Sequence, residues 1–219
     1  REIMQLFSVG LVELKSDGTP LLDANGEPIP TYDQEDIKQF ARVFTGWTYA
    51  NPDGSAITKK NAVYYGADIG VFPGTATTGH DTDAKTLLNG TTLLAGQTAQ
   101  KDLADAVQNV FVHPNTGPFV AKLLIQRLVT GNPSDAYVGR IAAKFANNGS
   151  GVRGDLKAVV RAILLDAEAR GAAKADPAFG SLREPVLMIT GLVRALNGVT
   201  DGAALGDRTS TLGQRPYYA

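Results

Sequence analysis

The chain contains no cysteine among its 219 residues. This excludes disulfide bonds, thiolate nucleophiles and cysteine-ligated zinc. Histidine is almost as scarce, since only His80 and His113 occur. Because imidazole is the side chain that titrates nearest to neutral pH, these two positions are the first candidates for acid–base chemistry.

The sequence also lacks an excess of one charge, a long apolar run and a nucleotide-binding loop. Lys and Arg number 21 and Asp and Glu number 22, which gives a formal net charge of -1. This balance provides no excess of positive charge that would attract nucleic acid or an anionic membrane. No apolar run approaches the roughly 20 residues that span a bilayer, and neither a Walker loop nor a GxGxxG motif occurs. The sequence thus predicts no nucleic-acid partner, no transmembrane segment in this chain and no cofactor.

The remaining composition is typical of a folded domain, with 43% hydrophobic and 20% charged residues. No internal repeat or biased linker divides the chain, so we expect one mostly helical domain over residues 1–219. Ile3, Leu6 and Phe7 already have helical spacing, and no initiator methionine precedes them. We therefore expect a fragment of a longer chain, with any targeting segment upstream of it.

The patterning predicts a mainly α fold, a multi-helix orthogonal bundle with two irregular parts. Residues 11–30 predict a small β-hairpin ornament, because Asn25-Gly26 is a strong hairpin signal and three prolines limit its strands to short edge pieces. Residues 48–79 predict a long irregular loop. The helices are expected over 33–44, 99–112 and 115–130, and after Ser134, Asp155 and the capping-box spacing of 181–184. The helix over 115–130 is apolar on most sides and is expected at the centre of the core.

His80 and Asp81 are the first candidate site, and we expect a helix to begin directly after them. A histidine oriented by a neighbouring carboxylate can act as a general base. The alternative is that Asp81 caps the helix, that His80 packs before it, and that Lys85 reaches back to the carboxylate. The alternative is favoured, since each residue then has an adequate structural role.

His113 is expected at the end of the helix over 99–112, where Pro114 stops the helix and Asn115 caps the next one. A charged histidine there gains from the helix dipole, which is a sufficient reason for its position, and a binding role is the alternative. The two histidines could hold zinc only if they met one carboxylate, such as Glu2 or Asp81, with a fourth position left open. Nothing in their spacing favours this, so no metal site is predicted.

Trp47 and Arg127 are candidate binding residues. Trp47, the only tryptophan, could form an aromatic platform for a sugar ring together with Tyr65. We favour instead a core position for Trp47, with its N–H bonded to a backbone carbonyl. Arg127 stands on an otherwise apolar helix, which predicts a buried ion pair with Glu2 or Asp36.

The chain resembles the bacterial "domain of unknown function 1800" family of uncharacterised exported proteins, over almost its whole length. The resemblance rests on an ordered set of motifs: REIMQL at 1–6, YDQEDI at 32–37, ARVFTGW at 41–47, HDTDAK at 80–85, HPNTGPFVAKL at 113–123 and LGQ at 212–214. It implies the C-terminal portion of a large helical protein, exported to the periplasm or secreted. It also implies a neighbouring gene for an exported sulfatase-like protein. Relatives often carry a glutamate and a histidine where this chain has Gln5 and Phe7, and the resemblance assigns no catalytic residue.

Two functional hypotheses follow. The first is an exported interaction or structural module that works with a partner protein, for which the sulfatase-like protein is a candidate. The second is a hydrolase of an exported polymer such as a polysaccharide, with His80 as the base, Asp81 orienting it, and Trp47 with Tyr65 as a sugar platform. The hydrolase requires the catalytic groups to converge in a pocket, whereas the module requires an exposed apolar or aromatic patch.

Overall fold

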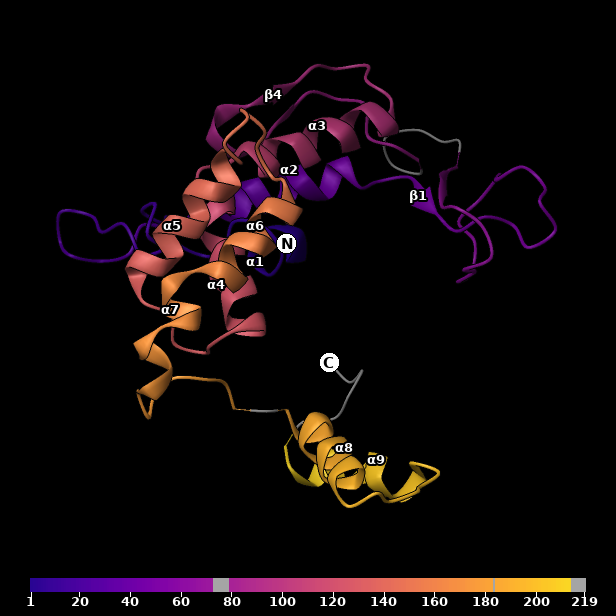
Figure 1. The fold of residues 1–219 in the computed structure, drawn as a ribbon. Helices are drawn as coiled ribbons and strands as arrows, with labels where there is room; N and C mark the ends of the chain where they lie inside the picture. The colour runs from indigo at the N-terminus through magenta and orange to yellow at the C-terminus, as the bar shows by residue number, and fades with distance from the viewer. Residues whose placement is uncertain (73–78, 183, 214–219) are drawn as a thin grey trace.

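The computed structural model describes residues 1–72, 79–182 and 184–213, and it is mainly helical. Its helices are α1 (Glu2–Gln5), α2 (Gln34–Val43), α3 (Ala99–Val112), α4 (Thr116–Leu128), α5 (Asp135–Ala146), α6 (Leu156–Leu165), α7 (Ala167–Arg170), α8 (Pro185–Ala195) and α9 (Ala203–Thr211). Short 3-10 turns occur at Leu88–Gly90 and Ala172–Ala175. Figure 1 shows these elements in space. The predicted fold class is confirmed, and the helix over 99–112 has the predicted bounds.

In the part of the chain that the structure describes, every helix is too short or too polar to cross a membrane.

The β structure is small and antiparallel. β1 (Trp47–Thr48) pairs with β2 (Gly70–Val71), and β3 (Lys85–Thr86) pairs with β4 (Thr92–Leu93). The expected ornament at 11–30 is confirmed as a meander of isolated bridges, each of which ends on a proline: Val12–Pro30, Leu14–Pro20 and Leu22–Pro28. Non-proline neighbours supply the donors, as proline cannot. The predicted loop over 48–79 includes β1 and β2, and its residues 73–78 lie outside the described residues.

A first core forms between α1, α2, α3 and the β3–β4 hairpin. The sequence starts α2 with a capping box, in which Asp33 accepts from the backbone of Asp36 and Asp36 accepts from the backbone of Asp33. Phe40 and Val43, on its inner face, are fully buried. The complete buried set is Met4, Val9, Phe40, Val43, Leu87, Leu88, Leu93, Ala106 and Val110.

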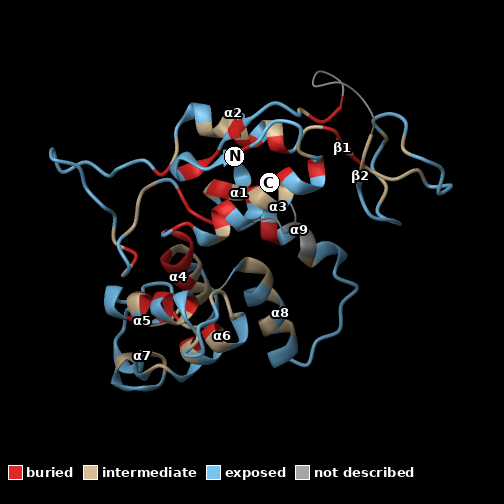
Figure 2. Cartoon of the chain, turned by 90° about the horizontal axis from the view of Figure 1, so that it is seen from above, coloured by how far each residue is buried: buried red, intermediate tan, exposed pale blue. Residues whose placement is uncertain are grey.

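A second core forms between α4, α5 and α6 (Figure 2). Ser134 and Asp155 cap α5 and α6 with their side chains, as predicted. Its buried residues are Ala121, Ile125, Tyr137, Val138, Ile141, Ala142, Phe145, Val159 and Ile163. The expectation that α4 is central was only half right. Ala121 and Ile125 are buried, but Leu123 and Leu128 on its other faces are exposed.

Asn115 joins the meander to the junction of α3 and α4. Its Nδ2 donates to the carbonyls of Val9, at 2.9 Å, and Val12, at 2.8 Å, and its Oδ1 accepts from the amide of Leu14 at 2.9 Å. Asn115 is the N-cap residue of α4, but its side chain makes no capping bond. The prediction that it caps this helix with its side chain is wrong, because the side chain is fully buried and committed to segments about 100 residues away.

The capping box expected at 181–184 is not the start of α8. The N-cap is Glu184, without a side-chain capping bond, and Pro185 opens the helix with its φ already suited to it. Ser181 instead donates to the carbonyl of Gln126. Arg183 lies outside the described residues.

Replacing Asn115 by alanine is expected to lower the free energy of unfolding by about 2–4 kcal/mol, because one buried carbonyl, one partly buried carbonyl and one amide lose their partner. The matched control is Asn25→Ala, at an exposed turn where the amide reaches only Asp23. Urea unfolding of both variants checks this. Equal midpoints for the two variants would contradict the joining role.

Candidate functional site

A buried polar cluster, here called the Asp102 cluster, connects the first turn of α3 to the β3–β4 hairpin. Asp102 Oδ2 accepts from Lys85 Nζ at 2.7 Å and lies 3.1 Å from His80 Nε2. Asp102 Oδ1 accepts from Gln97 at 2.6 Å. The side chains of Asp102 and Lys85 are both only 1% exposed. Lys85 Nζ also donates to the carbonyls of Asp81 and Asp83, so its charge is compensated on several sides.

The electrostatics of this cluster favour an ionised carboxylate. Burial raises the pKa of Asp102, but the hydrogen bonds from Lys85 and Gln97 and the positive charge of Lys85 outweigh it, so the pKa lies below its ordinary value. The cluster is therefore a buried ion pair with a histidine beside it. Such an arrangement is costly to break, since removal of one partner leaves an uncompensated buried charge.

Both ring nitrogens of His80 face protein oxygens. Nε2 faces Asp102, and Nδ1 lies 3.2 Å from the carbonyl of Thr45. Gly46 lets the two segments pass this close: its φ is +79°, and a Cβ there would lie 2.7 Å from the backbone nitrogen of His80. The ring is buried at 8% exposure. A general base needs a nitrogen within reach of substrate, and here both nitrogens already have partners within the fold.

Asp81 binds Arg42 rather than orienting His80. Arg42 donates to its carboxylate through Nε at 2.7 Å and Nη2 at 3.1 Å. These bonds lower the pKa of Asp81 to about 2. Nor does a helix begin at Asp81, because the chain runs extended into β3 instead. The prediction that Asp81 caps a helix is therefore wrong, and the carboxylate on the imidazole is that of Asp102.

Sequence analysis did not single out Asp102, although one signal marks it. It shares the spacing of the buried Ala99, Ala106 and Val110, so it is a carboxylate on the apolar face of α3. A charge in such a position requires a partner, and the candidates are the few basic residues nearby in sequence. The sequence predicted Lys85 as a partner of the Asp81 carboxylate. In the structure Lys85 Nζ lies 4.0 Å from Asp81 Oδ1, and its close carboxylate partner is Asp102.

His113 is the C-cap residue of α3, and it is buried at 2% exposure. Its Nδ1 accepts from the amide of Asn115 at 3.2 Å. Burial, followed by the nearby charge of Arg153, lowers the pKa of His113 below its usual value. The expected gain of a charged imidazole from the helix dipole is therefore wrong. Arg153 takes that role, since it donates to the carbonyls of Phe111, at 3.1 Å, and His113, at 3.0 Å.

The two histidines do not converge. His80 contacts the first turn of α3, and His113 is the C-cap residue of the same helix. The 11 residues from Asp102 to His113 span about 16 Å at 1.5 Å per residue. Within the described ranges, no set of three His, Asp or Glu side chains is arranged to hold a metal ion.

The aromatic candidates Trp47 and Tyr65 do not pair with each other among the described residues. Trp47 begins β1 opposite Val71, and its Nε1 is buried without a hydrogen-bond partner among the described residues, so the expected bond to a carbonyl is not formed there. Tyr65 is 84% exposed. Its ring stands edge-on to Tyr49 at a centroid distance of 5.7 Å and an angle of 86°. The rings that meet are those of Tyr49 and Tyr65, not those of Trp47 and Tyr65.

Arg127 lies on the surface rather than in the core. Its side chain is 74% exposed, and its Nη1 is 2.9 Å from Glu184. The predicted pairing with Glu2 or Asp36 is wrong, because Arg127 occupies the solvent-facing side of α4. Glu184 is the residue just before α8. The ion pair therefore lies where the chain leaves the second core and enters α8.

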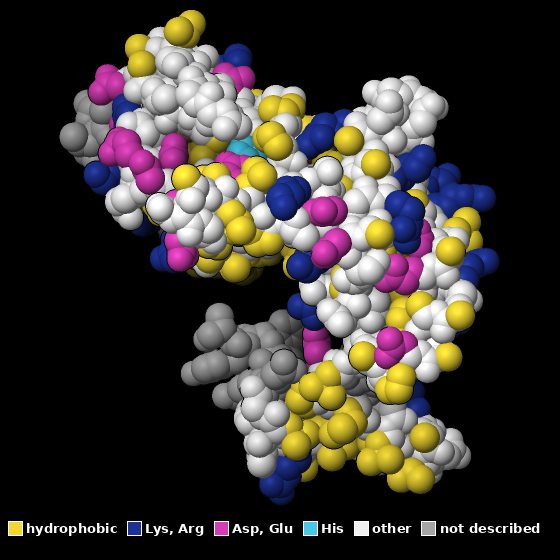
Figure 3. Space-filling view, turned by 90° about the vertical axis from the view of Figure 1, so that its left-hand side faces the viewer, with side chains coloured by type: hydrophobic (Ala, Val, Ile, Leu, Met, Phe, Trp, Pro, Cys, Tyr) yellow, Lys and Arg dark blue, Asp and Glu magenta, His cyan; other side chains and the backbone are white. Residues whose placement is uncertain are grey.

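α8 and α9 form a helical hairpin with an uncovered apolar surface. α8 contains only two polar side chains, Thr190 and Arg194, yet none of its residues is buried. Figure 3 shows hydrophobic side chains gathered on this hairpin at the lower end of the molecule. We call its exposed side the outer face, formed by Leu187, Met188, Gly191, Leu192 and Ala195 of α8 with Leu212 after α9.

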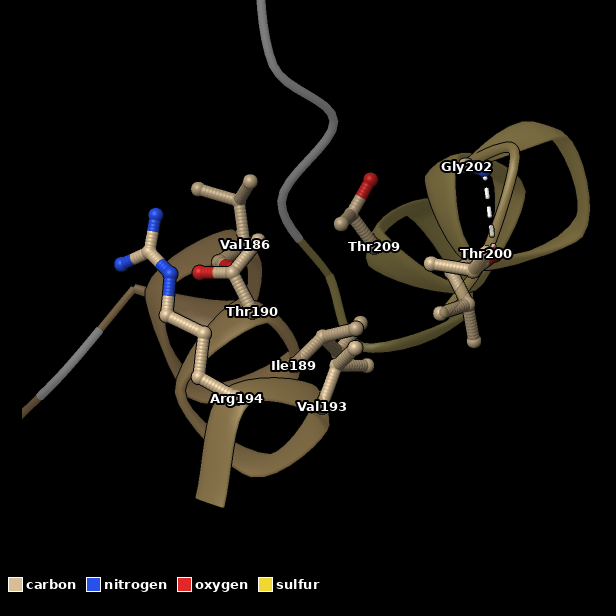
Figure 4. Close-up of a pocket in the computed structure, with 9 residues that line it drawn as sticks. Val186, Ile189, Thr190, Val193, Arg194, Thr200, Gly202 and Thr209 are labelled. Atoms are coloured by element: carbon tan, nitrogen blue, oxygen red, sulfur yellow. Dashed lines mark hydrogen bonds between the residues drawn. The ribbon is translucent and has the colours of Figure 1, made fainter. Parts of the chain in front are cut away.

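The hairpin is hollowed on two sides. A cavity of about 310 Å³ lies between Val186, Thr190 and Thr209, whose side chains approach one another from the two helices (Figure 4). A larger, open cavity of about 760 Å³ lies along the outer face and reaches Leu205, Arg208 and Thr211 of α9. This surface was not singled out by sequence analysis. The signal was present, since Leu187, Met188 and Leu192 fall outside the single helical stripe expected for a helix with one buried face.

Replacing Asp102 by alanine is expected to lower the free energy of unfolding by about 3–5 kcal/mol, because Lys85 and His80 lose their buried partner. The control is Asp105→Ala, one turn further along α3, where the carboxylate pairs with exposed Lys101. It should change stability by about 1 kcal/mol or less. Chemical denaturation of both variants is the measurement. An Asp102 variant as stable as its control would contradict the importance of the cluster.

Protonation of His113 is expected to destabilise the fold. Its folded pKa lies below the ordinary value of 6.5, so the unfolded chain binds the proton first as the pH falls. Stability should therefore be complete above about pH 6.5 and decline below it, by at most about 1.4 kcal/mol per pH unit. Thermal unfolding between pH 7.5 and 5 of the wild type and His113→Gln checks this. The variant should show the shallower decline, and equal slopes would refute the burial of a neutral ring.

Comparison with known proteins identifies a family for this chain. The model of the family described as "Protein of unknown function (DUF1800)" matches residues 1–219. No curated protein and no solved structure matches the chain. The motifs on which the resemblance was based include both histidine segments, and the family match extends over them all. The chain belongs to the DUF1800 family.

Proposed function

We propose that this chain is an interaction module that binds a partner protein through the α8–α9 hairpin. The observation that carries the proposal is α8, a nearly all-apolar helix of 11 residues with no buried residue. A helix of this composition is normally found in a core. Here the apolar side chains need a covering surface that the described part of the chain does not supply.

The energetics support a binding role. Leu187, Met188 and Leu192 are between 52% and 60% exposed. Complete burial of a fully exposed side chain of this kind is worth about 1.5–3 kcal/mol, and these three are already about half buried, so covering each contributes roughly half of that to association. Monomeric proteins rarely expose contiguous apolar patches of more than a few hundred Å² without such a use.

The attachment of the hairpin also supports this role. The preceding segment is fixed to the end of α4, where Gly131 donates to the carbonyl of Gly180 at 2.7 Å and Arg127 binds Glu184. Beyond these contacts α8 and α9 pack on each other, and they lie apart from the helices of the two cores (Figure 1). The two cores thus serve as a base from which the hairpin projects.

We place the module in the periplasm or outside the cell, with the exported sulfatase-like protein as the candidate partner, on the strength of the family resemblance. We rank the hydrolase hypothesis below it. His80 has both ring nitrogens bound, and Asp81 is paired with Arg42. The apolar hairpin, by contrast, has no role within the described fold.

A photo-crosslinking experiment in the producing cells tests this proposal. A benzophenone amino acid at Leu192 is expected to form an adduct of discrete mass with one partner, which mass spectrometry then identifies. The matched control carries the same group at Leu156 of α6, a leucine of similar exposure at 55%. The proposal fails if Leu192 gives no adduct, or the same adducts as Leu156.

A further inference from the structure

We propose that a cavity between the start of the meander and α4 binds a small organic carboxylate with an apolar body. The cavity shares no lining residue with the α8–α9 hairpin, so the inference goes beyond the proposed function. It combines two observations, an apolar cavity whose walls are fixed by the fold and an unpaired lysine in the lining.

The cavity lies between residues 9–20 and one face of α4, and its volume is about 280 Å³. Its walls include the apolar side chains of Leu11, Leu14, Phe119 and Leu123. Ligand pockets generally begin at roughly 300 Å³, and an engineered apolar cavity of about 150 Å³ binds benzene. The space therefore suits a small molecule. It does not admit a helix, which is about 10 Å across with its side chains.

The two walls are fixed by contacts within the fold. Asn115, which is fully buried, accepts from the amide of Leu14 and donates to the carbonyl of Val12, and both of these residues line the cavity. Gly10, at a φ of +76°, passes so close to α4 that a Cβ there would lie 2.9 Å from the ring of Phe119. A ligand can therefore enter without rearrangement of the backbone, which lowers the cost of binding.

Lys122 brings a positive charge to this apolar lining. Its side chain is exposed, and it forms no hydrogen bond or ion pair with a described residue. Residues 9–20 contain two carboxylates, and both are directed elsewhere. Glu13 lies 4.0 Å from His113 Nε2, and Asp17 accepts from Thr19. A ligand carboxylate would thus supply the counter-charge that the described part of the chain does not.

The chemistry of the lining selects the class of ligand. Apolar walls favour an aliphatic or aromatic body, since each Å² of apolar surface removed from water contributes about 25 cal/mol. Lys122 favours an anionic head group over a neutral or cationic one. A phosphate group is normally held by several converging donors, such as the amides of a helix N-terminus or a bidentate arginine. A single ammonium group in the lining suits the single charge of a carboxylate.

Octanoate and octylamine, which have equal chain length and opposite charge, test the inference by amide-resolved NMR titration of the chain. Octanoate should shift the amides of Gly10, Leu11 and Leu123. It should bind there roughly tenfold more tightly than octylamine, because an ion pair replaces a repulsion of similar size. The variant K122E should reverse this preference. The matched control K157E, at an exposed lysine of α6, should leave it unchanged.

A second pair of variants tests the cavity itself. Leu123→Trp adds an indole to the lining and should abolish the saturable octanoate shift at Gly10. The matched control is Leu128→Trp, on the same helix but outside the lining. The two leucines are similarly exposed, at 37% and 47%, so both variants should fold.

Three results would overturn the inference. The first is equal binding of octanoate and octylamine at Gly10 and Leu123, or a preference that K122E does not alter. The second is octanoate binding that Leu123→Trp leaves intact. The third is a set of octanoate shifts confined to α8 and α9, which would assign the carboxylate to the hairpin.

Discussion

The buried ion pair between Asp102 and Lys85 is the interaction on which the arrangement of the first core depends. It fixes the β3–β4 hairpin and the segment before it, which contains His80, against α3. It also orders Asp81 through the carbonyl that Lys85 binds. Asp81 in turn holds Arg42 at the end of α2. Residues that look like catalytic machinery in the sequence thus form one chain of contacts between three elements. The hydrogen bonds and ion pairs of these residues hold backbone segments in place, because their charged groups bind partners within the fold.

The second core depends on the end of α3 in a comparable way. Arg153 binds the last carbonyls of this helix, and its guanidinium stacks over the rings of Phe111 and Phe145. Asn115 binds the meander from the same junction. His113 stays neutral between them, since burial and Arg153 both oppose its charge. The two histidines therefore sit at opposite ends of one helix, each within a separate structural network.

Local signals predicted α2, α3, α5 and α6, although the helix expected after Asp81 does not form, whereas partners distant in sequence could not be predicted from them. Asp33, Ser134 and Asp155 act through atoms within a few residues, so their capping roles could be predicted from sequence. The partners of Asn115 and Arg127 lie about 100 and 57 residues away, and no local pattern selects them. The apolar hairpin was missed for a related reason. Periodicity shows that α8 is apolar on most faces, but it does not show whether a neighbour covers them.

The central claim is that α8 lies uncovered and that the histidine clusters serve the stability of the cores. Hydrogen exchange of the isolated chain, resolved to single helices, tests it most directly. The amides of α8 and α9 should exchange orders of magnitude faster than those of α3, because few contacts oppose local opening of an unpartnered hairpin. Protection of α8 equal to that of α3 in the monomer would contradict the account, since the apolar face would then already be covered by the chain itself.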